Sequence, residues 1–527
     1  MANKKKKQPP SLRRQIIKWT SLGVLALLLI VPYILLPDMD LPGTDVSGPL
    51  RPIDPSQCKL LLDVTAYDTN LEERVFHQQI FDEVLTLIRQ AETFVYLDFF
   101  LWNSWQGAVP EDHRKLATEL ADALIQRKEE KPDLLVLALT DPINRIYGND
   151  EEPFYHELAK QGIPVVFTDL DRLPASNLAY TPFERAYIRP FSRLPVIRRW
   201  FDRRAVKNLF DLQGEKISRR QVVNLLNFRA NHRKVVIADD AEGRMRVVVT
   251  SFNPADGSSA HSNIGLLLEG PVARDALSEE LKCVAWSAER PGQVLEESPG
   301  EVQRLLDAMT PKADVPDTVE EPAVDQPAAQ WLSEGAIRAR LLLMLGEAGP
   351  GDQVDIGIFY LSDRDVVRAI ADAAYAGADV RMIIDANRDA FGRIKNGVPN
   401  RPVAAELMKR SGGTGNLEIR WADTHGEQYH TKVLSVMNPD TGKYQLLCGS
   451  TNWTRRNIQD LNLEANVFIR NVPELSEAFS EYFERAWGNT DGLSYTLDYD
   501  RVAEGGWTLL RKTWMYRIQE ATGLSTF

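Results

Sequence analysis

Two short stretches decide the fold, His232-Arg-Lys234-Val-Val-Ile-Ala-Asp239 and His430-Thr-Lys432-Val-Leu-Ser. In both, a His-x-Lys pair leads into an apolar run that is typical of a buried strand. Residues two apart on a strand point to the same face, so each histidine and its lysine would address one substrate group together. A single His-x-Lys is a weak signal, because both residue types are common at protein surfaces. Two copies in matching surroundings indicate a functional site.

Each pair is followed by a second polar signature, Thr250-Ser-Phe-Asn253 after the first and Gly449-Ser-Thr-Asn452 after the second. Both signatures come directly after apolar runs, 245–249 and 444–448, which predict strands. Small residues at such positions let the backbone approach a ligand closely. The two parts of the chain therefore repeat one arrangement of candidate binding residues.

The order of predicted helices and strands repeats as well. Alternating helices and strands are typical of a mostly parallel sheet covered by helices. The sequence thus predicts an α/β fold of two duplicated halves, each a mixed β-sheet flanked by helices, which share one central active-site cleft. The predicted order is helix 77–88, strand 93–101, helix 115–127 and strand 134–140, then helix 336–345, strand 354–360, helix 365–375 and strand 379–385.

Composition sets the boundaries between these parts. Residues 38–56 are rich in Pro, Gly and Asp, and 311–327 combine prolines with acidic residues, so both segments are predicted to be exposed connections. The predicted division is a basic cytoplasmic tail at 1–15, a transmembrane signal anchor at 16–36, a tether at 37–57, a first half at 58–310, a linker at 311–327, a second half at 328–495 and a C-terminal extension at 496–527.

The N-terminus carries a targeting signal. Basic residues precede an apolar run from Trp19 to Leu36, and acidic residues follow it. A membrane-crossing helix needs about 20 residues, and its positive flank stays in the cytoplasm. Leu36-Pro37-Asp38-Met39 offers no small-residue cleavage site, which favours an uncleaved anchor, although cleavage stays open. We expect a single-pass protein of a bacterial inner membrane with its catalytic domains on the periplasmic side.

Charge and cysteines narrow the classes of function. The net charge is −12 and the isoelectric point about 5.3, so any affinity for phosphate groups must come from a local patch, and a nucleic-acid role is weakened. Cys58, Cys283 and Cys448 lie far apart without a C-x-x-C motif, so they indicate neither a zinc site nor a disulfide scaffold. We expect no metal, no other cofactor and no obligate protein partner.

The paired motifs resemble those of the phospholipase D superfamily, whose pattern is H-x-K-x4-D followed by G-S-x-N, present twice. The resemblance covers nearly the whole chain after the predicted anchor, and it implies a phosphodiesterase. A phosphodiester repels nucleophiles, so its site needs cations and donors around the phosphate oxygens, and these replace a metal. The implied phosphate-binding residues are Lys234, Lys432, Asn253 and Asn452, together with Ser251 and Ser450.

The same resemblance implies the roles of the histidines. His232 would be the nucleophile that forms a phosphohistidine, and His430 the general acid and later the general base. The first motif keeps its acid at Asp239, which is counted with the catalytic residues, although a structural ion pair is the alternative interpretation. The second motif has Met437 at that position.

The residues after the second motif match the polar tail of the family. They are Arg455, Arg456, Asn457, Asn462 and Glu464, and Glu464 is the expected carboxylate that orients a histidine. In the first copy, Asn263 aligns with Asn462 and Gly265 takes the place of Glu464. One histidine therefore lacks the usual partner at that position, and Glu269 is a candidate substitute.

Two segments bear on the substrate. Residues 185–207 are basic with interspersed aromatics, which suits an anionic lipid surface, single-stranded nucleic acid, or a solvated insertion whose aromatics pack inward. An amphipathic segment begins at Trp507, where packing against the body is favoured over membrane contact. Because the predicted anchor holds the site near a bilayer, we expect a phospholipid substrate.

The reaction keeps several alternatives. Water as the acceptor would give phospholipase D hydrolysis, and an alcohol acceptor would give phosphatidyl transfer, as in cardiolipin synthase. The alternatives in function are a membrane-anchored nuclease of the same superfamily and a non-catalytic membrane scaffold with a degenerate second motif.

Overall fold

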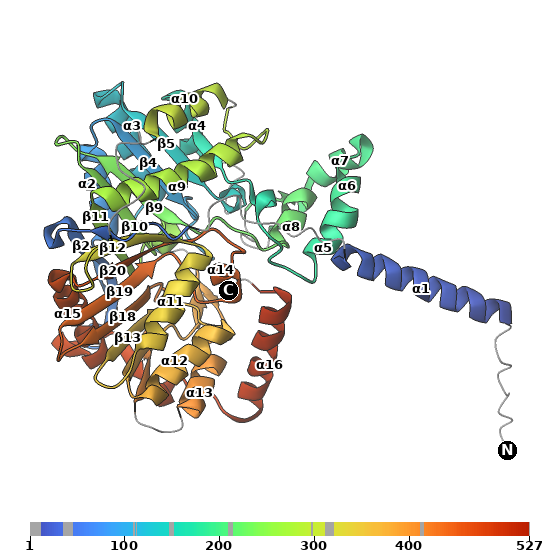
Figure 1. Cartoon of the computed structure of the whole chain (residues 1–527). Helices are drawn as coiled ribbons and strands as arrows, with labels where there is room; N and C mark the ends of the chain where they lie inside the picture. Colours follow the sequence, from blue (N-terminus) through green and yellow to red (C-terminus); the bar gives the residue numbers. More distant parts are fainter. Residues whose placement is uncertain are drawn as a thin grey trace, which may run out of the picture.

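The structure is a computed structural model in which two mixed β-sheets lie against each other, with helices on their outer faces (Figure 1). A long helix projects from this body near the N-terminus. The residues described are 12–34, 46–108, 111, 113–146, 152–208, 214–296, 299–310, 321–411 and 416–525.

The first sheet holds the His232 motif. Its strands β4, β5 and β6 are parallel to one another, and the pairs along the rest of the sheet are antiparallel. A further strand, β3 (Glu73–Gln78), pairs with β2 outside this order. The order is β21 (Leu493–Ser494), β2 (Cys58–Asp68), β11 (Asn263–Glu269), β10 (Met245–Thr250), β9 (Lys234–Asp239), β4 (Phe94–Phe99), β5 (Leu135–Thr140) and β6 (Val165–Phe167).

The second sheet holds the His430 motif and has three parallel strands in the corresponding place, β13, β14 and β17. The motif strands β9 and β18 occupy matching positions, each antiparallel to the first of the three parallel strands. The order is β1 (Arg51–Pro52), β12 (Ala328–Ser333), β20 (Ala465–Arg470), β19 (Lys443–Gly449), β18 (Lys432–Asn438), β13 (Gln353–Ile358), β14 (Asp379–Ile384), β17 (Leu417–Ala422) and β22 (Thr496–Asp498).

The predicted helices and strands form within a few residues of their expected bounds, because the apolar periodicity that predicts them is buried. Helix α2 (Ile80–Gln90) buries one apolar face, and α12 (Arg364–Ala376) begins where Asp363 accepts two backbone N–H groups. Helix α12 ends at Gly377, whose φ of +107° suits glycine. The other helices of this prediction are α3 (Leu116–Glu130) and α11 (Gly335–Glu347).

The two halves are joined by a shared core and by exchanged strands. Ile264 and Leu266 of β11 belong to one buried apolar cluster with Ala465 and Val467 of β20. Strand β1 pairs with the second sheet, although it precedes the first half in the chain, and β21 pairs with β2 of the first sheet. The end of the predicted tether is therefore part of the second sheet, and so is the start of the predicted extension, because β22 pairs with β17. Residues 311–320 of the predicted linker lie outside the described residues.

Most of the predicted anchor, 16–36, lies in one helix. Helix α1 spans Leu12–Ile34, so it begins before the predicted anchor and includes Arg13 and Lys18. Residues 35 and 36 of the predicted anchor lie outside the described residues. Among the described residues, none of the helices combines the length and the apolar character of a membrane span.

The expectation for the amphipathic C-terminal segment needs correction. Helix α16 (Gly506–Thr522) packs through Lys512 and Tyr516, whereas Trp507 and Trp514 of its apolar face are 85% and 64% exposed. The apolar face was expected to pack inward, but polar contacts of Tyr516 and Lys512 hold the helix instead.

The basic segment forms the short helices α6 (Arg189–Ser192) and α7 (Pro195–Asp202). Phe191 and Trp200 are exposed there, so these aromatics do not pack inward.

Candidate active site

The two His-x-Lys segments lie side by side with segments of the opposite half. The backbone N–H of His232 donates to the carbonyl of Leu463 at 2.8 Å, and that of His430 donates to the carbonyl of Ser262 at 2.8 Å. The same segments are joined by two isolated parallel β-bridges, Asn231 with Leu463 and Ser262 with Tyr429. Each histidine is thus positioned by both halves of the chain.

His232 has a carboxylate partner from the other half. Its Nδ1 lies 2.8 Å from Oε1 of Glu464, and the Glu464 side chain is fully buried. The hydroxyl of Ser450 and the amide of Asn457 donate to the same carboxylate. A carboxylate only accepts, so Nδ1 of His232 carries the proton, and Nε2 is the ring nitrogen available to react.

His430 has an amide partner instead of a carboxylate. Its Nδ1 lies 3.1 Å from Oδ1 of Asn263, which also accepts from the Ser251 hydroxyl at 3.3 Å. Asn263 therefore serves His430 as Glu464 serves His232.

This pairing corrects the expected alignment of the two copies. In the sheets, Thr250 pairs with Gly265 as Gly449 pairs with Asn466, so Asn263 corresponds to Glu464. The loop before Asn263 is shorter than its counterpart, and an alignment without a gap misplaces it.

Glu269 does not replace the missing carboxylate. It lies at the end of β11, and its Oε2 is 3.7 Å from Nη1 of Arg244. The suggestion that Glu269 orients a histidine was wrong, because Asn263 and Glu269 lie at opposite ends of the seven-residue strand β11.

The two lysines are held alike. Nζ of Lys234 donates to the carbonyl of His232 and Nζ of Lys432 to that of His430, both at 2.6 Å. Each ammonium also lies over an aromatic ring, 5.2 Å from Phe100 and 5.0 Å from Phe359. The ring of Phe100 is 4.9 Å from that of His232. The structure brings both His-x-Lys pairs into equivalent surroundings.

Burial controls the charge of these groups. It lowers the pKa of His232 to about 4, against the opposing effect of Glu464, and lowers the pKa of Lys234 to about 7. Burial and the positive charge of Lys432 hold the pKa of His430 well below its ordinary range, and Lys234 and His232 act in the same direction. The pKa of Lys432 is lowered in the same way. A bound phosphodiester anion would favour the charged forms of all four groups.

The predicted phosphate-binding residues divide into two kinds. Oδ1 of Asn253 accepts from the backbone of Leu101 at 3.2 Å, and Oδ1 of Asn452 has no partner within the described ranges. The hydroxyls of Ser251 and Ser450 differ from the prediction, because they bond to the partners of the histidines. They also accept the backbone N–H groups of the residues that follow those partners.

Asp239 is not brought to the histidines. It ends β9, and its carboxylate accepts from the backbone N–H of Thr93 at 2.9 Å and of Glu92 at 3.0 Å. The hydroxyl of Thr93 donates to it at 2.5 Å. Its catalytic assignment is therefore replaced by a structural one, which fixes the start of β4. Met437, its counterpart on β18, packs beside Ser476.

The sequence did not predict several residues that position the site. Arg233 bonds through Nη2 to Glu334 at 2.7 Å, and Glu334 accepts the backbone N–H of Glu464 at 2.9 Å. All three side chains are fully buried. The sequence could have indicated this role, because Arg233 lies between His232 and Lys234 at the start of a buried apolar run. A buried charge there needs a partner of opposite charge.

Two aspartates hold the segments before the histidines. Asp141 accepts the backbone N–H of Asn231 at 2.7 Å, and Asp385 accepts that of Tyr429 at 2.9 Å. The sequence could have indicated both aspartates, because each comes directly after a parallel strand, β5 or β14. Among the described residues, no group of three or more His, Cys, Asp or Glu side chains has the arrangement of a metal site.

The comparisons with known proteins agree with this geometry. The family model described as "Cardiolipin synthase, PLD-like domain" matches residues 341–487, which contain His430, Lys432, Asn452 and Glu464. The matched segment is therefore a phospholipase D-like domain. No sequence match is found among curated proteins.

Two solved structures are similar to this chain. A phosphatidylserine synthase from Haemophilus influenzae Rd KW20 is 13% identical, with a TM-score of 0.53, over 93% of this chain and 97% of that chain. A phospholipase D family member, Nuc from Salmonella typhimurium, is 22% identical over 33% of this chain and 99% of that chain, with a TM-score of 0.26.

Proposed function

We propose that the protein is a phosphodiesterase that acts on phospholipids through a phosphohistidine intermediate. The observation that carries the proposal is the crossed pairing of His232 with Glu464 and of His430 with Asn263. Two histidines with fixed Nδ1 protons and two lysines provide the nucleophile, the acid and the cations that this chemistry needs. The lysines and Asn452 would bind the non-bridging phosphate oxygens.

The reaction would take two steps. In the first, Nε2 of His232 attacks phosphorus, the bond from phosphorus to the headgroup oxygen breaks, and protonated His430 gives its proton to that oxygen. In the second, neutral His430 takes a proton from water or an alcohol, whose oxygen attacks phosphorus while the phosphorus–nitrogen bond breaks. Water as the acceptor gives hydrolysis to a phosphatidic acid, and an alcohol gives phosphatidyl transfer.

The different partners of the histidines support this order of roles. A phosphohistidine carries positive charge on its ring, which the carboxylate of Glu464 would stabilise. Asn263 offers no charge, so the imidazolium of His430 would lose its proton more readily, as a general acid requires. The seven strands from β2 to β6 have the same order in their sheet as the seven from β12 to β17, which supports a further part of the proposal, that the halves are duplicates sharing one cleft.

An exposed apolar face supports a lipid substrate. Trp507, Leu510, Trp514 and Ile518 line the outside of α16. Tryptophan and leucine on a helix face are typical of contact with the boundary between lipid headgroups and acyl chains. The family model is described for cardiolipin synthase, and the neighbouring fold is a phosphatidylserine synthase; both names suggest phospholipid chemistry.

The same surface continues toward α1 and the basic segment. The backbone of Ala179 links the helices, since its carbonyl accepts from the Tyr33 hydroxyl at 2.9 Å and its N–H donates to Thr522 at 3.4 Å. The Tyr187 hydroxyl donates to the carbonyl of Leu28 at 2.8 Å. Exposed arginines of α7 would add attraction to an anionic membrane. We place the lipid surface against this side of the molecule.

The periplasmic location is also a proposal, supported by the charges around 16–36. Digestion of intact spheroplasts by an added protease would cleave a protein on that side. Protection until the membrane is broken would reject the location.

Incubation with mixed phospholipids tests the function. Purified wild type, H232A and H430A are compared by mass spectrometry of the products, with and without added glycerol. Phosphatidic acid or exchanged headgroups from wild type alone is the expected result. Cleavage of single-stranded DNA without any lipid product would indicate the nuclease alternative, and no product of either kind would indicate the scaffold.

A further inference from the structure

A cavity of about 330 Å³ lies beside His232 and is lined by residues that the proposed reaction does not use. Phe100 forms part of its wall, and the Phe100 ring lies 4.9 Å from the ring of His232. Asp141 and Ala230 also line it, and Asp141 holds the backbone N–H of Asn231, next to His232. The cavity is therefore one side chain away from the proposed nucleophile.

Two arginines present unused donors at this cavity. Arg229 and Arg456 line it, and in the described part of the chain Nε and Nη2 of both are buried without a hydrogen-bond partner. The side chain of Arg229 is only 2% exposed, and its Nη1 donates to the carbonyl of Leu170 at 3.0 Å. A buried N–H donor without a hydrogen-bond partner costs folding free energy, and a guanidinium cannot avoid that cost by losing its proton. A ligand with several acceptor oxygens matches them.

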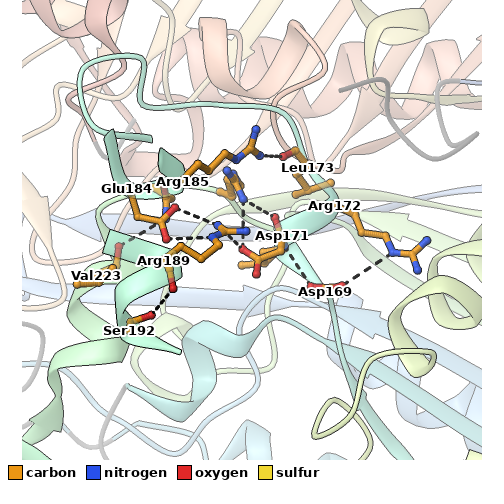
Figure 2. A network of polar contacts seen from close by, with 12 residues as sticks. Asp169, Asp171, Arg172, Leu173, Glu184, Arg185, Arg189, Ser192 and Val223 are labelled. Atoms are coloured by element: carbon orange, nitrogen blue, oxygen red, sulfur yellow. Dashed lines mark hydrogen bonds and ion pairs between the residues drawn. The ribbon is translucent and has the colours of Figure 1, made fainter. Parts of the chain in front are cut away.

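The acidic groups nearby are already shared. The carboxylate nearest Arg229 is Asp171, at 3.5 Å, and Asp171 also pairs with Arg189 at 2.8 Å and Arg290 at 2.7 Å. Figure 2 shows Asp171 and Arg189 at the centre of this network. Asp171 thus leaves the charge of Arg229 only partly balanced. In keeping with this, burial lowers the pKa of Arg229 to about 9.

The wall around Arg456 is apolar and its backbone is unusual. The guanidinium of Arg456 lies 5.0 Å from the centre of the Phe228 ring. Phe228 has a φ of +52°, in the left-handed region that bulky residues rarely adopt, and such conformations cluster where ligands bind. Ile146 and Leu225 add apolar side chains to a lining that also holds the carboxylates of Asp141, Asp169 and Asp171. The cavity combines cationic donors with surfaces that suit hydrocarbon.

We propose that this cavity binds a second phosphate group, carried by a ligand with an apolar part and distinct from the phosphate that the histidines attack. Arg229 and Arg456 supply paired N–H donors to the phosphate oxygens, because the planar guanidinium can donate two parallel hydrogen bonds to one phosphate. The apolar walls take the attached hydrocarbon. The inference rests on the proposed function in placing the first phosphate at His232 and His430, and it makes phosphate-bearing lipids the substrate class of the neighbouring site.

Calorimetric titration tests the cavity directly. The probes are inorganic phosphate and dihexanoyl phosphatidic acid, the latter below the concentration at which it aggregates. Wild type should bind two equivalents of the lipid, and R229Q and R456Q should each weaken one of the two sites about tenfold or more, the effect of losing a charge-assisted hydrogen bond. R199Q, which removes the same charge from the exposed face of α7, should keep both sites.

The two probes separate the sources of the phosphate. Binding of both at the arginine-dependent site means that the phosphate group suffices, and binding of the lipid alone means that its hydrocarbon is required. Two unchanged sites in R456Q and R229Q, or a single site in wild type, would overturn the proposal. If R229Q fails to fold, as judged by circular dichroism, R229K and R456Q decide the matter.

A separate assay keeps this proposal distinguishable from the proposed function. Dihexanoyl phosphatidylcholine carries one phosphate, and its hydrolysis by wild type reports on the histidines. H232A should lose this hydrolysis, whether or not the cavity site binds phosphate. If wild type binds two phosphates and hydrolyses no lipid, the proposed function is contradicted and the proposed cavity site is still supported.

Discussion

Nδ1 of His232 lies 2.8 Å from Oε1 of Glu464, although the two residues precede strands of different sheets, β9 and β20. The reverse crossing joins His430 to Asn263. The proposed reaction therefore depends on contacts between the halves, and the unequal partners give the two histidines unequal properties.

Replacing Glu464 tests the support of the nucleophile. In E464Q the ring of His232 loses the negative charge that stabilises a phosphohistidine, so kcat should fall about 10²–10³-fold with a smaller change in KM. Steady-state kinetics on a short-chain phospholipid measures both. E418Q, at an exposed position of β17, is the matched control and should behave as wild type. Activity of E464Q within a factor of two or three of wild type would contradict the role of this pair.

Replacing Asn263 by aspartate tests the acid. Burial and nearby cations hold the pKa of His430 low, and a carboxylate beside Nδ1 would favour the charged imidazolium and raise that pKa. The alkaline limb of the kcat profile records loss of the proton from the acid, so N263D should move this limb to higher pH by about one unit or more. A shift confined to the acidic limb would assign His430 to the opposite role.

Asp239 should matter for stability and not for catalysis. D239A removes the acceptor for the backbone of Glu92 and Thr93 and leaves those groups poorly paired, which costs about 1–3 kcal/mol of unfolding free energy. Thermal unfolding should show the loss, while kcat/KM at a temperature where the variant is folded stays near the wild-type value. A large fall in kcat with unchanged stability would return Asp239 to the reaction.

The exposed face of α16 should govern binding to membranes. The double variant W507A/W514A removes two exposed aromatic anchors, and sedimentation with vesicles of phosphatidylglycerol and phosphatidylcholine should show binding weakened about tenfold. Hydrolysis of a monomeric short-chain lipid should persist. Y375A, at an exposed aromatic of α12, is the control. Equal vesicle binding by W507A/W514A and wild type would place the lipid surface elsewhere.

The sequence predicted most of the architecture because its signals are local. Apolar periodicity located α2, α12 and the strands beside them, and the repeated motifs located His232 and His430. Contacts between distant segments left no such signal. Asn263 was assigned to the wrong counterpart because the shorter loop before it becomes visible only through the pairing of β10 with β11.

The surface was harder to predict than the core. The apolar face of α16 was expected to be buried, but amphipathicity does not reveal which face of a helix a neighbour covers. Tyr516 and Lys512 provide that contact through Glu406 and Glu504.

Trapping the covalent intermediate tests the central claim most directly. Wild type, H232Q and H430Q are mixed with a short-chain phospholipid, quenched rapidly under conditions that preserve phosphohistidine, digested and analysed by mass spectrometry. A phosphatidyl adduct on the peptide containing His232 in wild type, absent from H232Q, is the predicted result. An adduct on His430, or turnover by wild type without any adduct on His232, would contradict the account.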